Sequence, residues 1–400
     1  MMYYLGIDVG RHSHTAALIN EQGTLMRKPF RFAPVASGFA KLQELLAEAV
    51  GPGESLTVAL EASGHYWLSL YEHFHAAGYD VRVLNPLQVN AFRNQSIRGT
   101  KTDRVDALLI AQVLRFGLQL ESPPPDDTLL ALKQLTRYRA DLAHQVVRVK
   151  NQVTALLDQV FPEYKTVFRD LFGAASLAIL AQAATPEELA AMELETLEQT
   201  LRTHSAGRFG RAKARELHQQ AVGSFGIKMA AKAFGFQIQQ IVDQIQYLQG
   251  QIQTLDEKIH DLFQAFNCPI TTIPGIGETL GATIVAEVGD IHRFQHPKGG
   301  ATALVAFAGI DPRLVESGMH KGKAKMSKRG SRYLRRALHM ASFIGMRDDA
   351  MFRQIYQRQR ARGKHHFIAL SHVQNKLVHV IYSLLKHNRP YIPMEARAVS

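Results

Sequence analysis

The strongest constraint on the fold is a long hydrophobic repeat in the second half of the chain. Eight aliphatic residues recur at alternating spacings of three and four, at Ile238, Ile241, Ile245, Leu248, Ile252, Leu255, Ile259 and Leu262. A second repeat of this kind runs through Leu142, Val146, Val149, Val153, Leu156 and Val160. Such seams are typical of coiled-coil helices. The two helices could pair as an antiparallel hairpin or between chains, and we favour some contact between chains.

The residues before these helices follow a different pattern. Strand-like runs at 2–10, at 14–32 around a turn at 20–23, at 55–63 and at 79–86 alternate with helical stretches such as 38–49. This alternation predicts an α/β domain that ends near the proline-rich segment "ESPPPDD". We therefore expect an α/β domain at 1–122, a coiled-coil connector at 123–265 with a helical insertion at 161–235, and a mostly helical domain at 266–400.

Two carboxylates open the helix predicted for "KTDRVDALLIAQVL", residues 101–114. Asp103 and Asp106 are three residues apart and so share one helical face. Two such charges repel by about 4 kcal/mol at ~4 Å and an effective dielectric near 20. A divalent cation, Mg²⁺ or alternatively Mn²⁺, would turn this repulsion into binding. Asp8 ends the first strand and Glu61 a later one. We predict a metal site formed by these four residues.

Each carboxylate also has a structural explanation when it is taken alone. The "GIDVG" that contains Asp8 also begins sugar-kinase and actin-like folds, and Asp103 would be favoured by the dipole at a helix start. Glu61 could be a satisfied strand-end charge. The ordered set is more specific, because it matches the RNase H-like fold of the RuvC type. That fold is a frequent scaffold for two-metal phosphodiester chemistry.

The overall charge points to a polyanionic partner. The chain has 47 Lys and Arg against 35 Asp and Glu, a formal net charge of +12, and this favours nucleic acid over a membrane surface. Cys268 is the only cysteine, which excludes an intramolecular disulfide and a cysteine-based zinc site. Neither a signal peptide nor a bilayer-spanning segment is evident, so we expect a cytoplasmic protein with no membrane partner.

The last third of the chain carries two candidate phosphate-binding features. "IPGIGETLGATIVAEVG" resembles a helix-hairpin-helix, in which Gly275 and Gly277 would let backbone N–H groups approach a phosphate; a tight turn between core helices is the alternative. Between residues 313 and 336 there are nine basic residues and one acidic residue, Glu316. The basic residues are Arg313, Lys321, Lys323, Lys325, Lys328, Arg329, Arg332, Arg335 and Arg336.

A serine beside this basic run could perform covalent chemistry. Ser317 lies in "ESGMHKG", a polar and glycine-flanked segment. A serine hydroxyl attacks poorly unless a neighbouring group activates it and stabilises the developing charge. From residue type alone, Ser327 and Ser331 are nearly as good candidates.

Taken together, these motifs resemble the DEDD transposases of the "IS one-ten / IS eleven-eleven" insertion-sequence family, to which site-specific invertases are related. The similarity covers nearly the whole chain in family order. It is carried by "GIDVG", "ALEASGHYW", "KTDRVDA", "IPGIGETLGATIVAEVGD", "FAGIDP", "ESG" and "MSKRGSRYLRRAL". The segment at about 161–235 looks longer than the connector of shorter members.

The resemblance implies a mechanism and a set of partners. Asp8, Glu61, Asp103 and Asp106 would hold metal ions in a RuvC-like domain, and Ser317 would match the serine that attacks a DNA phosphate and forms a phosphoserine link. The partners would be donor and target DNA, a structured guide (bridge) RNA, and further copies of the chain in a dimer or tetramer. One subunit's acidic domain would combine with the serine of another.

Two other classes of function compete with this recombinase. A metal-dependent, structure-specific nuclease of the Holliday-junction type would use water as nucleophile and leave Ser317 without a role. A non-enzymatic nucleic-acid scaffold would carry a degenerate RNase H-like domain, and the presence of all four carboxylates argues against it. A covalent protein–DNA adduct separates the recombinase from the nuclease.

Overall fold

The structure is a computed structural model. It describes residues 1–62, 64–93, 102–117, 126–294, 299–313, 316–317, 320–321 and 325–393, with no side chains described at 87–88, 313, 316–317 and 320–321. The chain forms two compact units. The N-terminal unit comprises Met1–Asp126 with Asp290–Gln295, and the C-terminal unit comprises Asp127–Gly289 with His296–Ser400.

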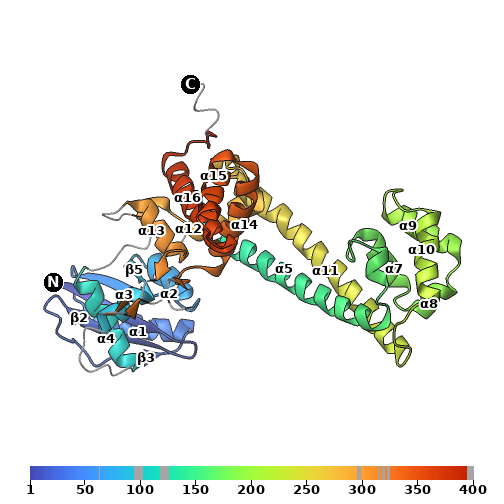
Figure 1. Ribbon diagram of the computed structural model, residues 1–400. Coiled ribbons are helices and arrows are strands. Elements are labelled where there is room, and N and C mark those ends of the chain that lie inside the picture. Colours follow the sequence, from blue (N-terminus) through green and yellow to red (C-terminus); the bar gives the residue numbers. More distant parts are fainter. Residues whose placement is uncertain are drawn as a thin grey trace. The chain divides into compact units, whose positions relative to one another are not determined.

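The N-terminal unit is built on a mixed five-stranded sheet with the strand order β3-β2-β1-β4-β5 (Figure 1). β1 pairs antiparallel with β2 and parallel with β4, and β4 pairs parallel with β5. The strands are β1 Met2–Val9, β2 His14–Asn20, β3 Phe30–Phe32, β4 Ser55–Glu61 and β5 Asp80–Leu84. The helices are α1 Ala36–Ala49, α2 Trp67–Ala76, α3 Pro86–Arg93 and α4 Asp103–Arg115, with the short η2 at Ile291–Arg293.

These elements confirm the predicted α/β pattern, and the order of strands is consistent with an RNase H-like fold. One detail differs from the prediction. The strand expected directly after the turn at 20–23 is reduced to a single bridge between Ile19 and Leu25, followed by the three-residue β3. The segment between them includes exposed residues such as Met26, so little apolar burial favours extending the ladder there.

The two faces of the sheet have different side chains, because successive residues of a strand point to opposite sides. On one face, Leu5 and Ile7 of β1 join a core with Leu42 of α1 and Phe74 of α2. On the other face, α4 covers β1, β2 and β4. Its Ile110 packs there in a second core with Ala59 and Leu84.

Gly6 of β1 sets how closely α4 approaches the sheet. It lies in register with Ala17 of β2 and Ala59 of β4, so three small residues form a flat patch. A Cβ atom at Gly6 would overlap the backbone of Ala107 and Ala111 and lie 2.9 Å from the Ala111 Cα. The helix backbone therefore rests directly on the strand at this point.

In the C-terminal unit, the two heptad helices pair with each other within one chain (Figure 1). They are α5 Asp127–Val160 and α11 Ala231–Gln264, each of 34 residues. Contact between chains, which we also favoured, stays a prediction. The seams shift at two ends: Leu157 is buried rather than Leu156, and Phe263 rather than Leu262. A straight helix drifts relative to a 3.5-residue repeat, which accounts for such one-residue shifts.

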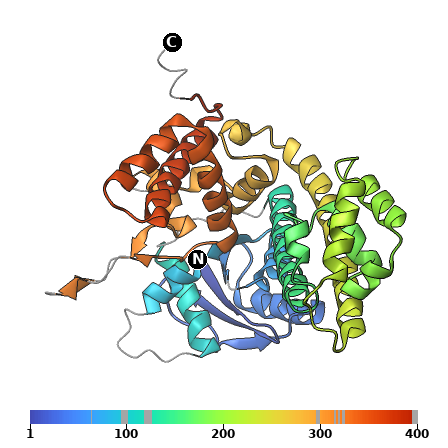
Figure 2. The same cartoon turned by 45° about the vertical axis from the view of Figure 1, so that its right-hand side comes forward.

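In the sequence, five short helices lie between α5 and α11, where the sequence predicted a helical insertion. The chain after α11 is mostly helical. The insertion helices are α6 Tyr164–Val167, α7 Ala174–Gln182, α8 Pro186–Ala191, α9 Leu194–His204 and α10 Arg211–Val222. The region after α11 contains η1 Pro269–Thr272, α12 Glu278–Val288, α13 Gly300–Ala308, α14 Arg332–Asp348, α15 Ala350–Ala361 and α16 His366–His387. The last three pack against one another, in red in Figure 2. None of the described helices has the length and apolarity needed to cross a membrane.

Two short ladders interrupt the helices of this region. β6 Pro312–Arg313 pairs antiparallel with β9 Lys325–Met326, and β7 Glu316–Ser317 pairs antiparallel with β8 His320–Lys321. The sequence did not predict these strands. Each is only two residues long, too short for a periodic signal.

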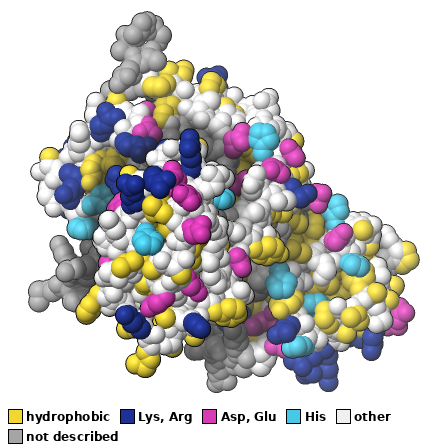
Figure 3. All heavy atoms as spheres, turned by 90° about the vertical axis from the view of Figure 1, so that its right-hand side faces the viewer, with side chains coloured by type: hydrophobic (Ala, Val, Ile, Leu, Met, Phe, Trp, Pro, Cys, Tyr) yellow, Lys and Arg dark blue, Asp and Glu magenta, His cyan; other side chains and the backbone are white. Residues whose placement is uncertain are grey.

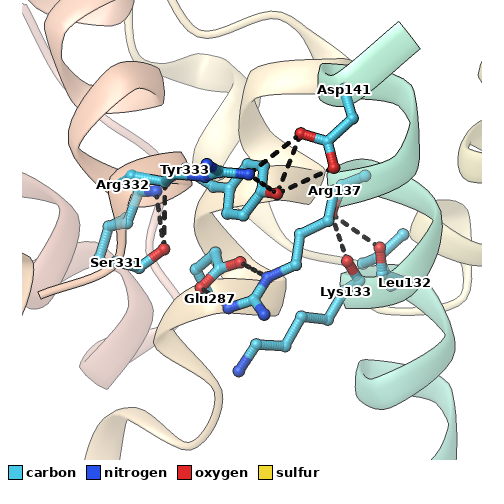
Figure 4. A network of polar contacts seen from close by, with 10 residues as sticks. Leu132, Lys133, Arg137, Asp141, Glu287, Ser331, Arg332 and Tyr333 are labelled. Carbon is cyan, nitrogen blue, oxygen red and sulfur yellow. Dashed lines mark hydrogen bonds and ion pairs between the residues drawn. The ribbon is translucent and has the colours of Figure 1, made fainter. Parts of the chain in front are cut away.

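A polar network joins α5 to α12 and α14 (Figure 4). Arg137 of α5 donates two hydrogen bonds to Glu287 of α12, from Nε at 2.5 Å and from Nη2 at 2.9 Å. Glu287 is only 2% exposed, and its carboxylate raises the pKa of Arg137, chiefly through these hydrogen bonds. Asp141, one helical turn further along α5, accepts hydrogen bonds from Tyr333 and Arg332 of α14.

We expect Gly6→Ala to destabilise the protein by about 1–3 kcal/mol or more, because its methyl group overlaps the α4 backbone. Urea unfolding monitored by circular dichroism measures this. Gly250→Ala is the matched control, since a Cβ there meets no atom within 4 Å on an exposed face of α11. That change should be neutral or stabilising by up to about 1 kcal/mol. Equal effects of the two changes would contradict close packing at Gly6.

We expect Arg137→Met to cost about 3–5 kcal/mol, because it leaves the buried Glu287 carboxylate without its partner. The double variant Arg137→Met/Glu287→Met should recover most of this loss in the same unfolding measurement. Lys165→Met removes an exposed ion pair with Asp158 and should cost less than about 1 kcal/mol. A double variant as unstable as Arg137→Met would show that packing, rather than the unpaired charge, accounts for the loss.

Candidate active site

Asp8 and Glu61 lie at one edge of the N-terminal sheet because their strands are parallel neighbours. Ile7 of β1 is in register with Leu60 of β4, so the next residue of each strand is a carboxylate. Asp8 stands two residues after Gly6 and Glu61 two after Ala59. Side chains two apart share a face, so both acids lie on the face that α4 covers.

The first turn of α4 supplies the other two carboxylates. The helix begins after Thr102, whose Oγ1 accepts a hydrogen bond from the Val105 N–H at 3.3 Å. Asp103 lies four residues before Ala107, and Ala107 four before Ala111, so these positions share one helical face. Since Ala107 and Ala111 rest on Gly6, the preceding turn carries Asp103 and Asp106 toward Asp8. Asp103 and Asp106 therefore lie close enough to Asp8 to act on its charge. That the four acids bind a metal together stays a prediction.

The pKa of Asp8 reflects both its burial and the charges of the three other acids. Burial raises the pKa of Asp8 to about 6, with further contributions from the charges of Asp106, Asp103 and Glu61 in that order. The guanidinium of Arg93 acts in the opposite direction and lowers the pKa. Each of the three other acids therefore contributes to the raised pKa of Asp8.

Two arginines that sequence reasoning missed neutralise part of this charge. Arg93, at the end of α3, places Nη2 2.9 Å from Oδ1 of the buried Asp106. Arg31 of β3 forms an ion pair with the exposed Asp103. Both arginines are remote in sequence from their partners, and no local motif marks either one.

The donor set fits a hard divalent cation, although the carboxylates are not gathered around one. Carboxylate oxygens are the ligands that Mg²⁺ prefers. Asp106 Oδ1 is buried and has no hydrogen-bond partner among the described residues, because its contact with Arg93 is close but poorly aligned. Within the described ranges, no three His, Cys, Asp or Glu side chains form a metal-binding group. The arginine pairs hold Asp103 and Asp106, so metal binding requires these two acids to be released.

The C-terminal unit contains the three candidate serines. Ser317 lies on β7, facing His320 across the ladder, rather than in the open loop that its sequence suggested; its side chain lies outside the description. Ser327 Oγ donates a hydrogen bond to Asp311. Ser331 caps α14 by accepting hydrogen bonds from the N–H groups of Tyr333 and Leu334. The latter two serines therefore have structural roles.

The two glycines of the helix-hairpin-helix motif differ in their surroundings. Gly275 has a φ of +90°, and a Cβ atom there would lie 2.6 Å from the Gly345 nitrogen of α14. Its conformation and this close packing explain its presence without a ligand. Gly277 is exposed, precedes α12, and has no atom within 4 Å of the Cβ position. Only Gly277 leaves backbone open to a phosphate.

The basic run also divides into separate roles. Arg335 points inward and donates hydrogen bonds to the carbonyls of Gly330 and Ala308. Arg332 pairs with Asp141, whereas Lys325, Lys328, Arg329 and Arg336 are exposed. Arg313 and Lys321 lie on strands without described side chains, and Lys323 lies outside the described residues. On the face drawn in Figure 3, Lys and Arg side chains gather in groups.

Comparison with known families identifies two regions of similarity. Residues 5–162 match a family described as a DEDD transposase, and residues 269–357 match the "Transposase IS116/IS110/IS902 family". The chain is 26% identical to a "Mini-circle putative transposase for IS117" of Streptomyces coelicolor, over 99% of the chain and 96% of that relative. A "Transposase for insertion sequence element IS1328" of Yersinia enterocolitica is 26% identical over 86% of the chain and 83% of the relative. A "Pilin gene-inverting protein" of Moraxella lacunata is 22% identical over 97% of both.

We expect Asp8→Asn to stabilise the metal-free protein at pH 8 by about 1 kcal/mol, after allowance for solvent screening. The folded pKa of Asp8, about 6, exceeds its unfolded value. The ionised carboxylate therefore costs stability above pH 6, and this cost disappears as the pH falls below about 4. The gain should accordingly vanish near pH 4. Thermal unfolding in EDTA at the two pH values measures it.

The same measurement with Mg²⁺ tests the metal site. Mg²⁺ should raise the unfolding temperature of the unmodified protein at pH 8 and leave that of Asp8→Asn nearly unchanged, because a ligand stabilises only the state that binds it. Glu48→Gln is the control, because Glu48 is an exposed carboxylate on α1. This variant should keep the response to Mg²⁺. An equal response in Asp8→Asn and the unmodified protein would contradict a metal site at Asp8.

Proposed function

The chain belongs to the DEDD transposases of the IS116/IS110/IS902 family and acts in DNA transposition, and from this premise we propose that it recombines DNA through a covalent serine intermediate. In this proposal the N-terminal unit is a RuvC-type RNase H fold that holds Mg²⁺ with Asp8, Glu61, Asp103 and Asp106. Ser317 of the C-terminal unit is the nucleophile.

The proposal is supported by four acids near one edge of the sheet, three of which act on the charge of the fourth, Asp8. Two come from strand ends and two from the helix that rests on Gly6. Burial first, and then the charges of the neighbouring acids, raise the pKa of Asp8, so ionising Asp8 at this site costs free energy. Residues retained at such a cost are those expected at functional sites. A divalent cation bound there would polarise a DNA phosphate and stabilise the leaving oxygen.

The proposed reaction exchanges one phosphodiester for another. The Ser317 Oγ loses its proton and attacks phosphorus, the bond to the leaving DNA oxygen breaks, and that oxygen takes up a proton as a free hydroxyl. Attack by the hydroxyl of another strand then reverses the step, releases serine and rejoins the DNA. Every phosphodiester bond broken is replaced by another, so the exchange needs no external energy source.

The partners in this proposal are donor and target DNA, a structured non-coding guide RNA and other copies of the chain. The net charge of +12 supports polyanionic partners. Guide RNA and assembly as a dimer or tetramer rest on family resemblance. In such an assembly the acidic site of one subunit would act with Ser317 of another.

We expect a covalent protein–DNA adduct when the purified full chain meets labelled element-junction DNA, the adjoining non-coding RNA and Mg²⁺. Denaturing gel electrophoresis detects it as a slowly migrating band that protease removes. Ser317→Ala should lose the band because it lacks the attacking oxygen. Asp106→Asn should lose it too, because the site then has one fewer charged ligand.

Ser327→Ala is the matched control and should keep the adduct, since the Ser327 hydroxyl is engaged with Asp311. Loss of the adduct in Ser327→Ala but not in Ser317→Ala would reassign the nucleophile. Cleavage without an adduct, equal in unmodified protein and Ser317→Ala, would instead establish a hydrolytic nuclease.

A further inference from the structure

The C-terminal unit has a groove that the proposed chemistry has not used. It lies where α15, α16 and the β6–β9 ladder meet, and its volume is about 1090 Å³. Typical small-molecule sites span about 300–1,000 Å³, so this groove lies at the upper end of that range. The floor is apolar, with Met351 and Ile355 on α15 and Ile310 before β6.

Charge along the groove has a single sign. Lys325, Arg358, Lys364 and Lys376 line it, and none of the lining residues is acidic. None of these four cations forms an ion pair with another residue that the structure describes. All four side chains are exposed, so they are available to a ligand. A concave surface with one sign of charge concentrates ligands of the opposite sign.

The groove also offers exposed apolar surface beside these cations. Phe367 is 64% exposed at the start of α16, and Ile368 next to it is 49% exposed. An exposed aromatic ring beside several cations is the arrangement on which nucleic-acid bases stack while the backbone follows the charges. A simple polyanion such as inorganic phosphate would make no use of the ring.

The lining residues recur along one face of α15 and one face of α16, and this stripe defines the length of the groove. On α15 the lining residues Met351, Gln354, Ile355 and Arg358 recur at spacings of three and four. On α16 the lining stripe runs from Ile368 to His379, about three turns or 16 Å of helix. Because an aromatic ring such as the exposed Phe367 stacks on an unpaired base, the groove suits one strand rather than a duplex.

Chain connectivity brings the groove near Ser317. Lys325 and Met326 of β9 line the groove and pair with Pro312 and Arg313 of β6. Ser317 follows Arg313 by four residues, which can span at most about 14 Å when fully extended. A strand that passes β9 therefore lies within reach of the serine.

We propose that this groove binds a single DNA strand, and that this is the strand whose phosphate is presented to Ser317. The cations at Lys325, Arg358, Lys364 and Lys376 hold successive phosphates, and Phe367 stacks on a base. The inference rests on the proposed serine chemistry, because proximity to Ser317 favours DNA over the guide RNA as the occupant.

The test is binding of a fluorescent single-stranded DNA oligonucleotide to the full chain over a range of salt concentrations. The variant Arg358→Gln/Lys364→Gln/Lys376→Gln should bind at least about tenfold more weakly. The slope of log K against log salt should become shallower by about 2, because each lost phosphate contact removes ~0.7 for single strands. Phe367→Ala should weaken binding about tenfold without changing the slope, because it removes stacking but no charge.

A matched control removes the same charge elsewhere. Arg202→Gln/Arg215→Gln/Lys228→Gln neutralises three exposed cations in and after the insertion helices and should keep both affinity and slope. Equal losses in the two triple variants would show a general effect of net charge and overturn the proposal. Single-stranded RNA of the same sequence is the second probe, and a groove variant that weakens RNA binding while sparing DNA would assign the groove to RNA.

The adduct assay keeps this inference separate from the proposed function. Unmodified protein that forms the Ser317 adduct, together with a groove variant that binds single-stranded DNA normally, would overturn the groove and leave the serine chemistry intact. A groove variant with weakened DNA binding and a reduced adduct yield, restored at higher DNA concentration, is the expected result. Weakened binding with an unchanged adduct yield at limiting DNA would show that the strand in the groove is not the one attacked.

Discussion

The contact between Gly6 and α4 is the constraint on which the acidic site depends. Only a residue without a side chain lets the backbone of Ala107 and Ala111 rest on β1, with Ala17 and Ala59 in register on either side. Moving along β1 by two residues leads from Gly6 to Asp8, and moving back along α4 by one turn leads from Ala107 to Asp103. A single packing point therefore fixes the distance between strand acids and helix acids. Any larger residue at Gly6 would move Asp103 and Asp106 relative to Asp8 and Glu61.

Much of this arrangement could be predicted from the sequence because it follows from local periodicity. The two-residue repeat of strands places Asp8 and Gly6 on one face, and helical spacing places Asp103 beside Asp106. The heptad seams predicted α5 and α11 for a similar reason. Pairing across long sequence separations was not predictable. Arg93 and Arg31 meet their aspartates through the tertiary fold, and the two-residue strands around Ser317 are too short for any periodic signal.

The arginine contacts change the energetic description of the acidic site. Four carboxylates without a cation would repel strongly, and the fold limits this by placing Arg93 beside Asp106 and Arg31 beside Asp103. Metal binding at this site would require both pairs to open. The Arg31 pair is exposed and so contributes little, while Asp106 Oδ1 lacks a well-aligned hydrogen bond. The two arginines thus offset part of the negative charge of the acids.

In the C-terminal unit, the segment that contains Ser317 is anchored at its base. Gly330 packs against the Phe307 carbonyl, and the N–H groups of Ser327 and Lys328 donate to the carbonyls of Asp311 and Gly309 at 2.9 Å each. These contacts fix the base of the segment from Pro312 to Met326, whose two ladders together involve only eight residues. Backbone contacts therefore anchor the base of the segment that contains Ser317. If Ser317 attacks DNA as we propose, other parts of the chain must position the phosphate. In our proposal, the cationic groove beside β9 provides that positioning.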